Sequence, residues 1–154
     1  MYERKTLLNL MDKDYSEKYL RKILMSVKTI AIVGASNDPE RDSYKVMKDL
    51  IKNGFKVFPV NPNLKDSLIL NRKCYPDLIS IKEQIDMVDI FRNIDAVMGV
   101  TEEAITVNAK ILWMQLDIIH EKAAKIAEKS GMKVVMNRCP KIELSKPYWT
   151  SKIK

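Results

Sequence analysis

The chain is poor in the residues that build disulfide frameworks and metal centres. Its 154 residues include two cysteines and one histidine. Cys74 and Cys139 are far apart and show no C-x-x-C spacing. A disulfide-stapled fold and a zinc site both need more such residues at closer intervals. We therefore expect neither of them.

Long hydrophobic runs are also missing. No stretch of about 18 apolar residues is available to span a bilayer, and residues 1–22 lack the apolar centre of a signal peptide. These absences predict a cytoplasmic protein without a membrane partner. The length, with 46% hydrophobic residues, fits one packed domain over residues 1–154. Within it we expect a lead-in helix at about 14–27 and a short basic tail at about 144–154.

Acidic residues are in the minority. The chain has 27 Lys and Arg against 20 Asp and Glu, a formal net charge of +7. This excess suits an anionic partner such as a phosphorylated cofactor, nucleic acid or a lipid surface, although lysines spread along the chain also fit an ordinary solvated surface. A nucleic-acid-binding function has no other support, because no helix-turn-helix, RNP-like or zinc-finger pattern occurs.

What the sequence does contain is an alternation of short β-branched runs and amphipathic segments, several of them ended by glycine. We predict strands at Thr29–Val33, Lys56–Val60, Val88–Phe91, Ile111–Met114 and Lys133–Met136, and helices at Asp14–Val27, from Asp42 or Ser43 to Asn53, at Asp95–Asn108 and at His120–Ser130. This order implies right-handed crossovers between parallel strands. The predicted fold class is α/β, a Rossmann-like, doubly wound, parallel five-stranded sheet with helices on both faces.

Two details concern the second strand and the segment after it. Pro59 has no N–H to donate to a ladder, so we place it at the exit of that strand. The polar stretch from Asn61 to Asn71 is expected to be a loop. In such sheets ligands bind beyond the carboxyl ends of the strands, where the strand order reverses. The residues just after each strand are therefore the candidates for a binding site.

The segment after the first strand has the composition of a phosphate-binding turn. Gly34 lets the backbone approach a ligand, and Ser36 offers a hydroxyl group. The next helix presents free N–H groups and the positive end of its dipole. Arg41, close to the helix start, can add a bidentate phosphate contact. An ordinary strand-to-helix turn with a surface arginine has the same sequence, so that alternative stays open.

A dinucleotide fingerprint is absent from this segment. Gly34 is its one glycine, where G-x-G-x-x-G has three, and the second strand ends in Asn61-Pro62 instead of the acid that binds the ribose of NAD. Without that carboxylate an extra ribose phosphate is not repelled. NADP and coenzyme A (CoA) are therefore favoured over NAD, and an NADP-dependent oxidoreductase is the alternative to a CoA-binding protein.

Several motifs, taken in order, resemble the stand-alone CoA-binding domain proteins, which are similar to the N-terminal domain of the succinyl-CoA synthetase α subunit. The resemblance covers about residues 14–143 and depends on Gly34-Ala35-Ser36 with Pro39, Arg41 and Ser43, on Val60-Asn61-Pro62, on Val88-Asp89-Ile90-Phe91-Arg92, on Trp113-Met114-Gln115 and on Arg138-Cys139. It implies CoA or acyl-CoA bound across the switch point. The diphosphate lies near the first loop, and the adenosine lies against the loop after the second strand.

The resemblance also implies which residues contact the cofactor. The first-loop contacts are Gly34, Ala35, Ser36, Arg41 and Ser43; the adenosine edge is Val60, Asn61 and Pro62, with Lys65 nearby; and Phe91, Arg92 and Gln115 lie near the pantetheine path.

The chain departs from the family pattern at three positions. Synthetases have a lysine two residues after Pro62, whereas this chain has Leu64 there and Lys65 one residue later. The family usually has glycine where Asn71 and Asp117 stand. Both positions adjoin expected ligand loops, so a reduced affinity or an altered acyl form follows as a hypothesis.

No catalytic constellation is visible. A synthetase-type mechanism needs a phosphorylated histidine on a second domain, and His120, at a predicted helix start, favours a surface role. Cys139 follows a buried strand and has no histidine near it in sequence, which favours an inert packed thiol. Trp113 is expected in the core. The sequence therefore predicts a non-catalytic protein that binds CoA or acyl-CoA, while a homo-oligomer or a protein partner stays open.

Overall fold

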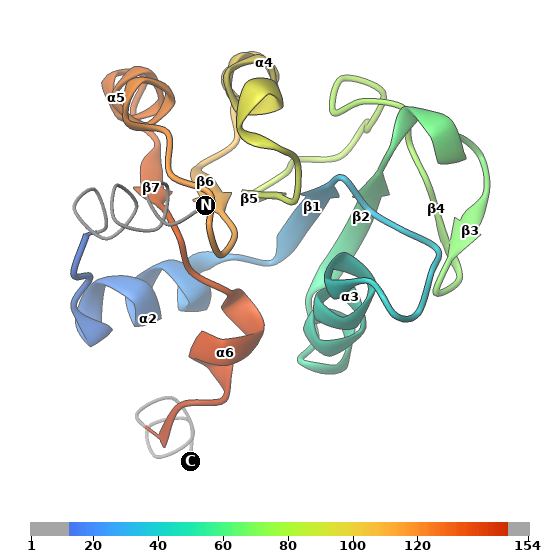
Figure 1. The fold of residues 1–154 in the computed structure, drawn as a ribbon, viewed down its shortest axis with the longest axis horizontal. Coiled ribbons are helices and arrows are strands. Elements are labelled where there is room, and N and C mark those ends of the chain that lie inside the picture. The colour runs from blue at the N-terminus through green and yellow to red at the C-terminus, as the bar shows by residue number, and fades with distance from the viewer. Residues whose placement is uncertain (1–12, 148–154) are drawn as a thin grey trace, which may run out of the picture.

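The computed structural model describes residues 13–147, and it confirms the predicted sheet (Figure 1). Five parallel strands lie in the order β2-β1-β5-β6-β7. Their bounds are β1 Thr29–Val33, β2 Lys56–Val60, β5 Met87–Ile90, β6 Ile111–Met114 and β7 Lys133–Val135. The chain winds outward to β2 on one side of β1 and to β5, β6 and β7 on the other. The strand order therefore reverses between β1 and β5, which is the switch point of a doubly wound fold.

Helices cover both faces of the sheet, as predicted. Figure 1 shows helices above the sheet and below it. The upper pair is α4 (Ile94–Thr106) and α5 (Glu121–Lys129), and the lower set is α2 (Glu17–Ser26), α3 (Asp42–Lys52) and α6 (Pro140–Leu144). No helix within residues 13–147 is long and apolar enough to cross a membrane.

The β-branched strands are apolar because each is buried on both faces. In β1, Ala31 and Val33 point to the core under α4 and α5, while Ile30 and Ile32 point to the core that packs on α2 and α3. Both isoleucines are fully buried. Full burial of one such side chain is worth about 1.5–3 kcal/mol. The two cores together hold the sheet between its helices and leave only its ends open.

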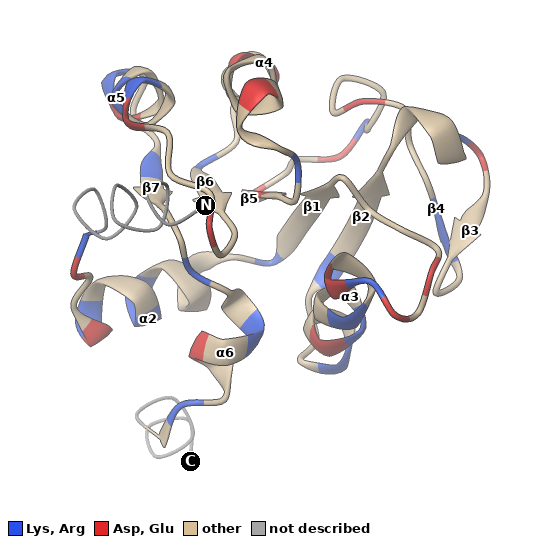
Figure 2. Ribbon diagram, viewed as in Figure 1, with Lys and Arg blue, Asp and Glu red and all other residues tan. Residues whose placement is uncertain are grey.

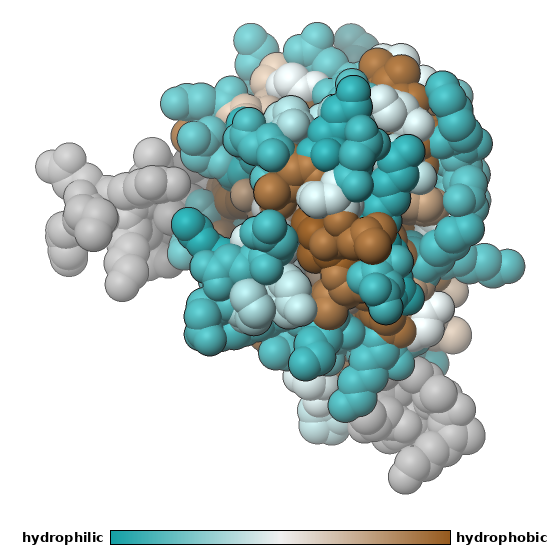
Figure 3. Space-filling model, turned by 90° about the vertical axis from the view of Figure 1, so that its right-hand side faces the viewer, coloured by the Kyte–Doolittle hydropathy of each residue, from teal (hydrophilic) through white to brown (hydrophobic). Residues whose placement is uncertain are grey.

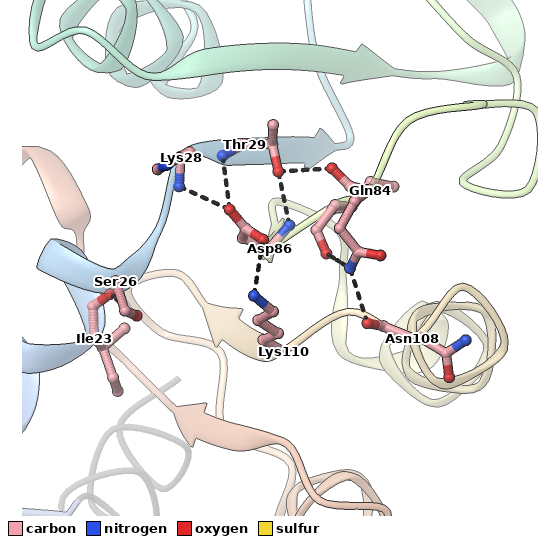
Figure 4. A network of polar contacts seen from close by, with 9 residues as sticks. Ile23, Ser26, Lys28, Thr29, Gln84, Asp86, Asn108 and Lys110 are labelled. Carbon is pink, nitrogen blue, oxygen red and sulfur yellow. Dashed lines mark hydrogen bonds and ion pairs between the residues drawn. The ribbon is translucent and has the colours of Figure 1, made fainter.

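Polar contacts close the amino end of the sheet (Figure 4). The Asp86 carboxylate accepts hydrogen bonds from the backbone N–H groups of Lys28 (2.8 Å) and Thr29 (3.2 Å), and Lys110 Nζ lies 3.6 Å from it. Burial acts to raise the pKa of Asp86, but these hydrogen bonds and the lysine charge outweigh it and lower that pKa. The groups at this end are thus paired with one another, and the opposite edge is the one left for a ligand.

The predicted element boundaries differ from the observed ones by up to three residues, the usual uncertainty at frayed ends. Helix α3 begins at Asp42, and its cap residue is Arg41 instead of the predicted Asp42 or Ser43. Pro59 lies inside β2 and not at its exit. It is tolerated because β2 is the edge strand, where a missing N–H leaves no neighbour unpaired on that side.

One prediction of irregular structure was wrong. The stretch from Asn61 to Asn71 contains a 3-10 helix, η1 (Pro62–Leu64), and β3 (Leu68–Ile69), which pairs antiparallel with β4 (Arg72–Lys73). These strands are too short to show an alternating pattern. Their two-residue turn has positive φ at Leu70 and Asn71, the geometry of a type I′ hairpin turn.

Helix α6 (Pro140–Leu144) was also missed. It ends at Leu144, where the region predicted as a basic tail at about 144–154 begins, and residues 148–154 of that tail are outside the described part of the chain.

The surface is mixed in character. Lys and Arg alternate with Asp and Glu along α3 and α5 (Figure 2). The face at the right of Figure 1 is mainly hydrophilic, with an apolar patch in its middle (Figure 3). The net positive charge is therefore not gathered on these helices into one basic stripe of the kind that tracks nucleic acid.

Candidate functional site

Three adjoining cavities open at the carboxyl edge of the sheet, around the switch point between β1 and β5. Their volumes are about 440, 330 and 740 Å³. The first two share Gly34 and Asn61, and Phe91 lines both the first and the third. The strands and helices thus bring the loops after β1, β2 and β5 to one place, where ligands of doubly wound sheets bind.

Gly34 is required by the close approach of two of these loops. Its φ is +94°, a left-handed conformation that other residues rarely adopt, and a Cβ atom there would lie 2.6 Å from the Phe91 carbonyl oxygen. From the sequence we expected this glycine to let a ligand approach the backbone. In the structure it lets the backbone of Phe91, directly after β5, approach instead. The N–H groups of Gly34 and Ala35 both donate to the Val60 carbonyl, at 2.9 and 3.2 Å.

Asn61 connects the loop after β2 to the loop after β1. Its Nδ2 donates to the Ala35 carbonyl oxygen at 2.8 Å, and its Oδ1 accepts from the Asn63 N–H at 2.9 Å to cap η1. An aspartate could make only the second of these contacts, because a carboxylate has no donor. The residue that stands where an NAD site has its acid is therefore also a structural link between the two loops.

The start of α3 is open toward the first cavity. A turn precedes it, in which Ser36 Oγ accepts from the Asp38 N–H (3.0 Å) and Asp38 Oδ1 accepts from the Glu40 N–H (3.0 Å). Arg41 then makes no side-chain cap hydrogen bond and is exposed. Arg41 and the first residues of α3, Asp42 and Ser43, line this cavity, so a guanidinium group and the positive dipole end of a helix can hold an anion beside the Asp42 carboxylate.

Most of the predicted site residues line these cavities. The 440 Å³ cavity is lined by Gly34, Ala35, Ser36, Arg41, Ser43, Asn61 and Phe91; the 330 Å³ cavity adds Val60, Pro62 and Arg92; and the 740 Å³ cavity adds Gln115. Lys65 is the exception. It is exposed, follows η1 and lines none of the three cavities.

Sequence reasoning missed several lining residues. Asn63 and Leu64 come from η1, and Lys141, Ile142 and Leu144 come from α6. One signal for α6 was present, because Pro140 has the residue type that is favoured at the first position of a helix. The 3-10 helix had a similar signal in Asn61-Pro62, an Asn cap followed by proline.

A buried carboxyl group lies behind the third cavity. Asp89, in β5, is fully buried, and burial raises its pKa well above the ordinary value. With its amide nitrogen turned toward Asp89, Gln115 donates to Oδ1 at 3.0 Å and to Oδ2 at 3.2 Å. No Lys or Arg among residues 13–147 forms an ion pair with Asp89. Gln115 lines the cavity, so this carboxyl group holds the orientation of one wall side chain.

The two positions at which the family pattern has glycine need left-handed backbone in this chain too. Asn71 has φ 64° and Asp117 has φ 67°. Asn and Asp are the non-glycine residues that tolerate this conformation best. The Asp117 N–H also donates to Asn137 Oδ1 at 2.7 Å, which stabilises the turn. Asn71 and Asp117 thus adopt the backbone conformation for which the family pattern uses glycine.

Three residues singled out in the sequence have structural roles. His120 caps α5, where its Nδ1 accepts from the Ala123 N–H at 3.1 Å, so it is a partly buried cap and not a free surface residue. Trp113 is fully buried, as predicted, and its Nε1 donates to the Arg138 carbonyl at 2.8 Å. Cys139 is buried but lines the 740 Å³ cavity.

The fold and the place of the cavities define a Rossmann-like α/β protein with a binding site at its switch point. Comparison with known proteins narrows this class, because residues 28–145 match the family model described as a CoA binding domain. The chain belongs to that CoA-binding domain family.

The relatives include small proteins of similar length. The uncharacterized protein YneT of Bacillus subtilis is 33% identical over 127 residues, which cover 82% of this chain and 93% of YneT. A hypothetical protein from Pyrococcus horikoshii OT3, of known structure, has a TM-score of 0.79 and 40% identity, and the match covers 84% of this chain and 90% of that one.

Another relative is much longer. An ADP-forming acetate–CoA ligase of Methanocaldococcus jannaschii is 26% identical over 135 residues, which are 82% of this chain but only 18% of the ligase. The chain therefore corresponds to one part of such an enzyme.

Proposed function

We propose that this protein binds CoA or an acyl-CoA at the switch point and catalyses no reaction with it. The proposal rests on one observation. The loops after β1, β2 and β5 meet beside the start of α3, which has no side-chain cap. Family membership supports the choice of cofactor, since the ligase relative is named for its use of CoA.

The residues of this site suit the parts of CoA in different ways. Arg41, Ser36 and the N–H groups at the start of α3 would hold the diphosphate, because they offer a cation and hydrogen-bond donors. The cavity beside Asn61 and Pro62 would hold the adenosine, because no acid stands at the end of β2 and the two acids that line this cavity already accept hydrogen bonds, Asp77 from Ser80 and Glu103 from Leu78. Residues Phe91, Arg92 and Gln115 would follow the pantetheine arm into the third cavity.

Calorimetric titration of one preparation with CoA, dephospho-CoA, NAD and NADP, at low and at high salt, tests the proposal. We expect CoA to bind most tightly and more weakly as salt is added, because its phosphates are charged. Dephospho-CoA should lose about 1 kcal/mol, the value of one partly exposed ionic contact. Tighter binding of NAD or NADP than of CoA would overturn the proposal in favour of an oxidoreductase, whereas equal affinity for CoA and dephospho-CoA would reject only the role of the loop after β2.

Arg41→Ala tests the diphosphate contact. Loss of one charge-assisted hydrogen bond should weaken CoA binding by about 1–3 kcal/mol, and the fold should survive because the side chain is exposed. Lys48→Ala is the matched control: this lysine is also exposed on α3 but lines none of the three cavities, so it removes the same charge at a distance. Equal losses in both variants would mean that Arg41 acts only through the net charge.

A further inference from the structure

The 740 Å³ cavity is the largest of the three cavities at the switch point. It lies where α6 approaches α3, beside the loop after β6. Its lining residues on α3 run from Asp42 to Lys52 and so follow the whole helix, which is about 16 Å long. The cavity is therefore an elongated groove that begins at the switch point and continues along α3.

Apolar side chains from four parts of the chain line this groove. They are Val46 from α3, Phe91 from the loop after β5, Leu116 and Ile118 from the loop after β6, and Cys139, Ile142 and Leu144 from the segment that contains α6. Leu116 and Ile142 are 48% and 46% exposed, and they are among the few large hydrophobic residues of the described chain that face solvent to this degree. Two such side chains in one groove indicate an apolar ligand.

The groove is continuous with the proposed CoA site. Phe91 and Asp42 line both the groove and the 440 Å³ cavity at the start of α3, and Arg92 lines both the groove and the 330 Å³ cavity. A ligand whose diphosphate lies at the start of α3 can consequently extend past Phe91 into the groove. The charged residues along it have both signs: the cations are Lys45, Lys52, Arg92 and Lys141, and the acids are Asp42 and Asp49.

We propose that this groove binds the acyl chain of a fatty acyl-CoA, so that the ligand of the protein is an acyl-CoA with a chain of medium length. The inference depends on the proposed CoA site, since the thioester must be delivered to the groove by the bound cofactor. It adds the class of the acyl group, a hydrocarbon chain, and it makes α6 the element that supplies one wall.

The test compares CoA with butanoyl-, octanoyl- and dodecanoyl-CoA by calorimetry, at concentrations below those at which the longest forms micelles. Each CH₂ group that becomes fully buried strengthens binding about fourfold. Because part of the chain stays near solvent, we expect octanoyl-CoA to bind at least about tenfold more tightly than CoA. A charged substitution in the groove, Ile142→Glu or Leu116→Glu, should remove most of that gain.

Met25→Glu is the matched control, because Met25 is 60% exposed on α2 and lines none of the three cavities. It should leave the ratio of octanoyl-CoA to CoA affinity unchanged. Thermal unfolding of each variant checks that the fold is intact, which the exposure of all three side chains favours.

The outcomes separate this inference from the proposed function. CoA binding with no dependence on chain length would overturn the acyl groove and leave the CoA site standing. A gain with chain length that survives both Ile142→Glu and Leu116→Glu would place the chain elsewhere and overturn the inference. Failure of CoA and of all acyl-CoA ligands to bind would overturn both proposals together.

Discussion

Asp89 lies in an environment that is unusual for an acidic side chain. It lies at the centre of the sheet, opposite Ile32 of β1 and Trp113 of β6, with no exposed surface. Two effects compete there: burial raises the pKa of this carboxyl group, whereas the Gln115 amide stabilises the ionised form. Burial dominates because no charged partner is present among the described residues. Asp89 thus orients Gln115, and its burial has a cost in the stability of the folded state.

That cost predicts the pH dependence of an Asp89→Asn variant. An unfolded aspartate releases its proton near pH 4, whereas folded Asp89 keeps it to a higher pH. The wild-type protein therefore loses stability as pH rises above about 4, until the raised pKa is passed. The amide introduced by Asp89→Asn does not ionise, so the variant should gain stability relative to wild type as pH rises above about 4, up to the raised pKa of Asp89.

Urea denaturation at several pH values measures this difference. Glu102→Gln, at an exposed position of α4, is the control and should show no such trend. A stability difference between Asp89→Asn and wild type that does not change with pH would show that Asp89 is not held in its protonated form.

At the scale of elements, the site depends on how closely the loops after β1 and β5 approach. Gly34→Ala would force a Cβ atom against the Phe91 carbonyl and would strain the backbone at φ +94°. We expect a loss of about 2 kcal/mol or more in the free energy of unfolding, together with weaker CoA binding. Thermal and urea denaturation measure the first effect, and titration measures the second.

Gly99→Ala is the control for that substitution. Gly99 lies within α4, with open space where its Cβ would be and no positive φ. Alanine there should stabilise the protein by about 0.5–1 kcal/mol, because it favours the helix and restricts the unfolded chain. If both variants were equally stable, the contact between Gly34 and Phe91 would not hold the two loops together.

At the scale of the whole molecule, the chain corresponds to 18% of the acetate–CoA ligase that it resembles. We predict no acyl-CoA formation when the pure protein is incubated with CoA, ATP and a carboxylic acid. The one histidine caps α5 through Nδ1, and Ser80, whose Oγ donates to Asp77 Oδ1 at 2.7 Å, lines none of the three cavities. Product above that of a heat-killed sample, measured by chromatography, would contradict this prediction.

The order of elements could be predicted from the sequence alone, as could the edge of the sheet at which the cavities open. Runs such as Thr29–Val33 are apolar throughout because a parallel strand is buried on both faces, so local composition reports the fold directly. Gly34, Arg41 and Asn61 were predicted as site residues because ligands of this fold meet the residues that follow the strands, and all three line the 440 Å³ cavity.

The features that depend on contacts between distant segments were decided only by the tertiary structure. The need for Gly34 comes from Phe91, and the link from Asn61 to Ala35 joins two loops; neither contact has a local pattern. The groove between α3 and α6 exists because packing brings together segments that are about 90 residues apart in sequence, and Lys65, next to the site in sequence, lies outside it. Sequence periodicity reports which face of an element is buried, whereas the shape of a cavity depends on how the elements pack.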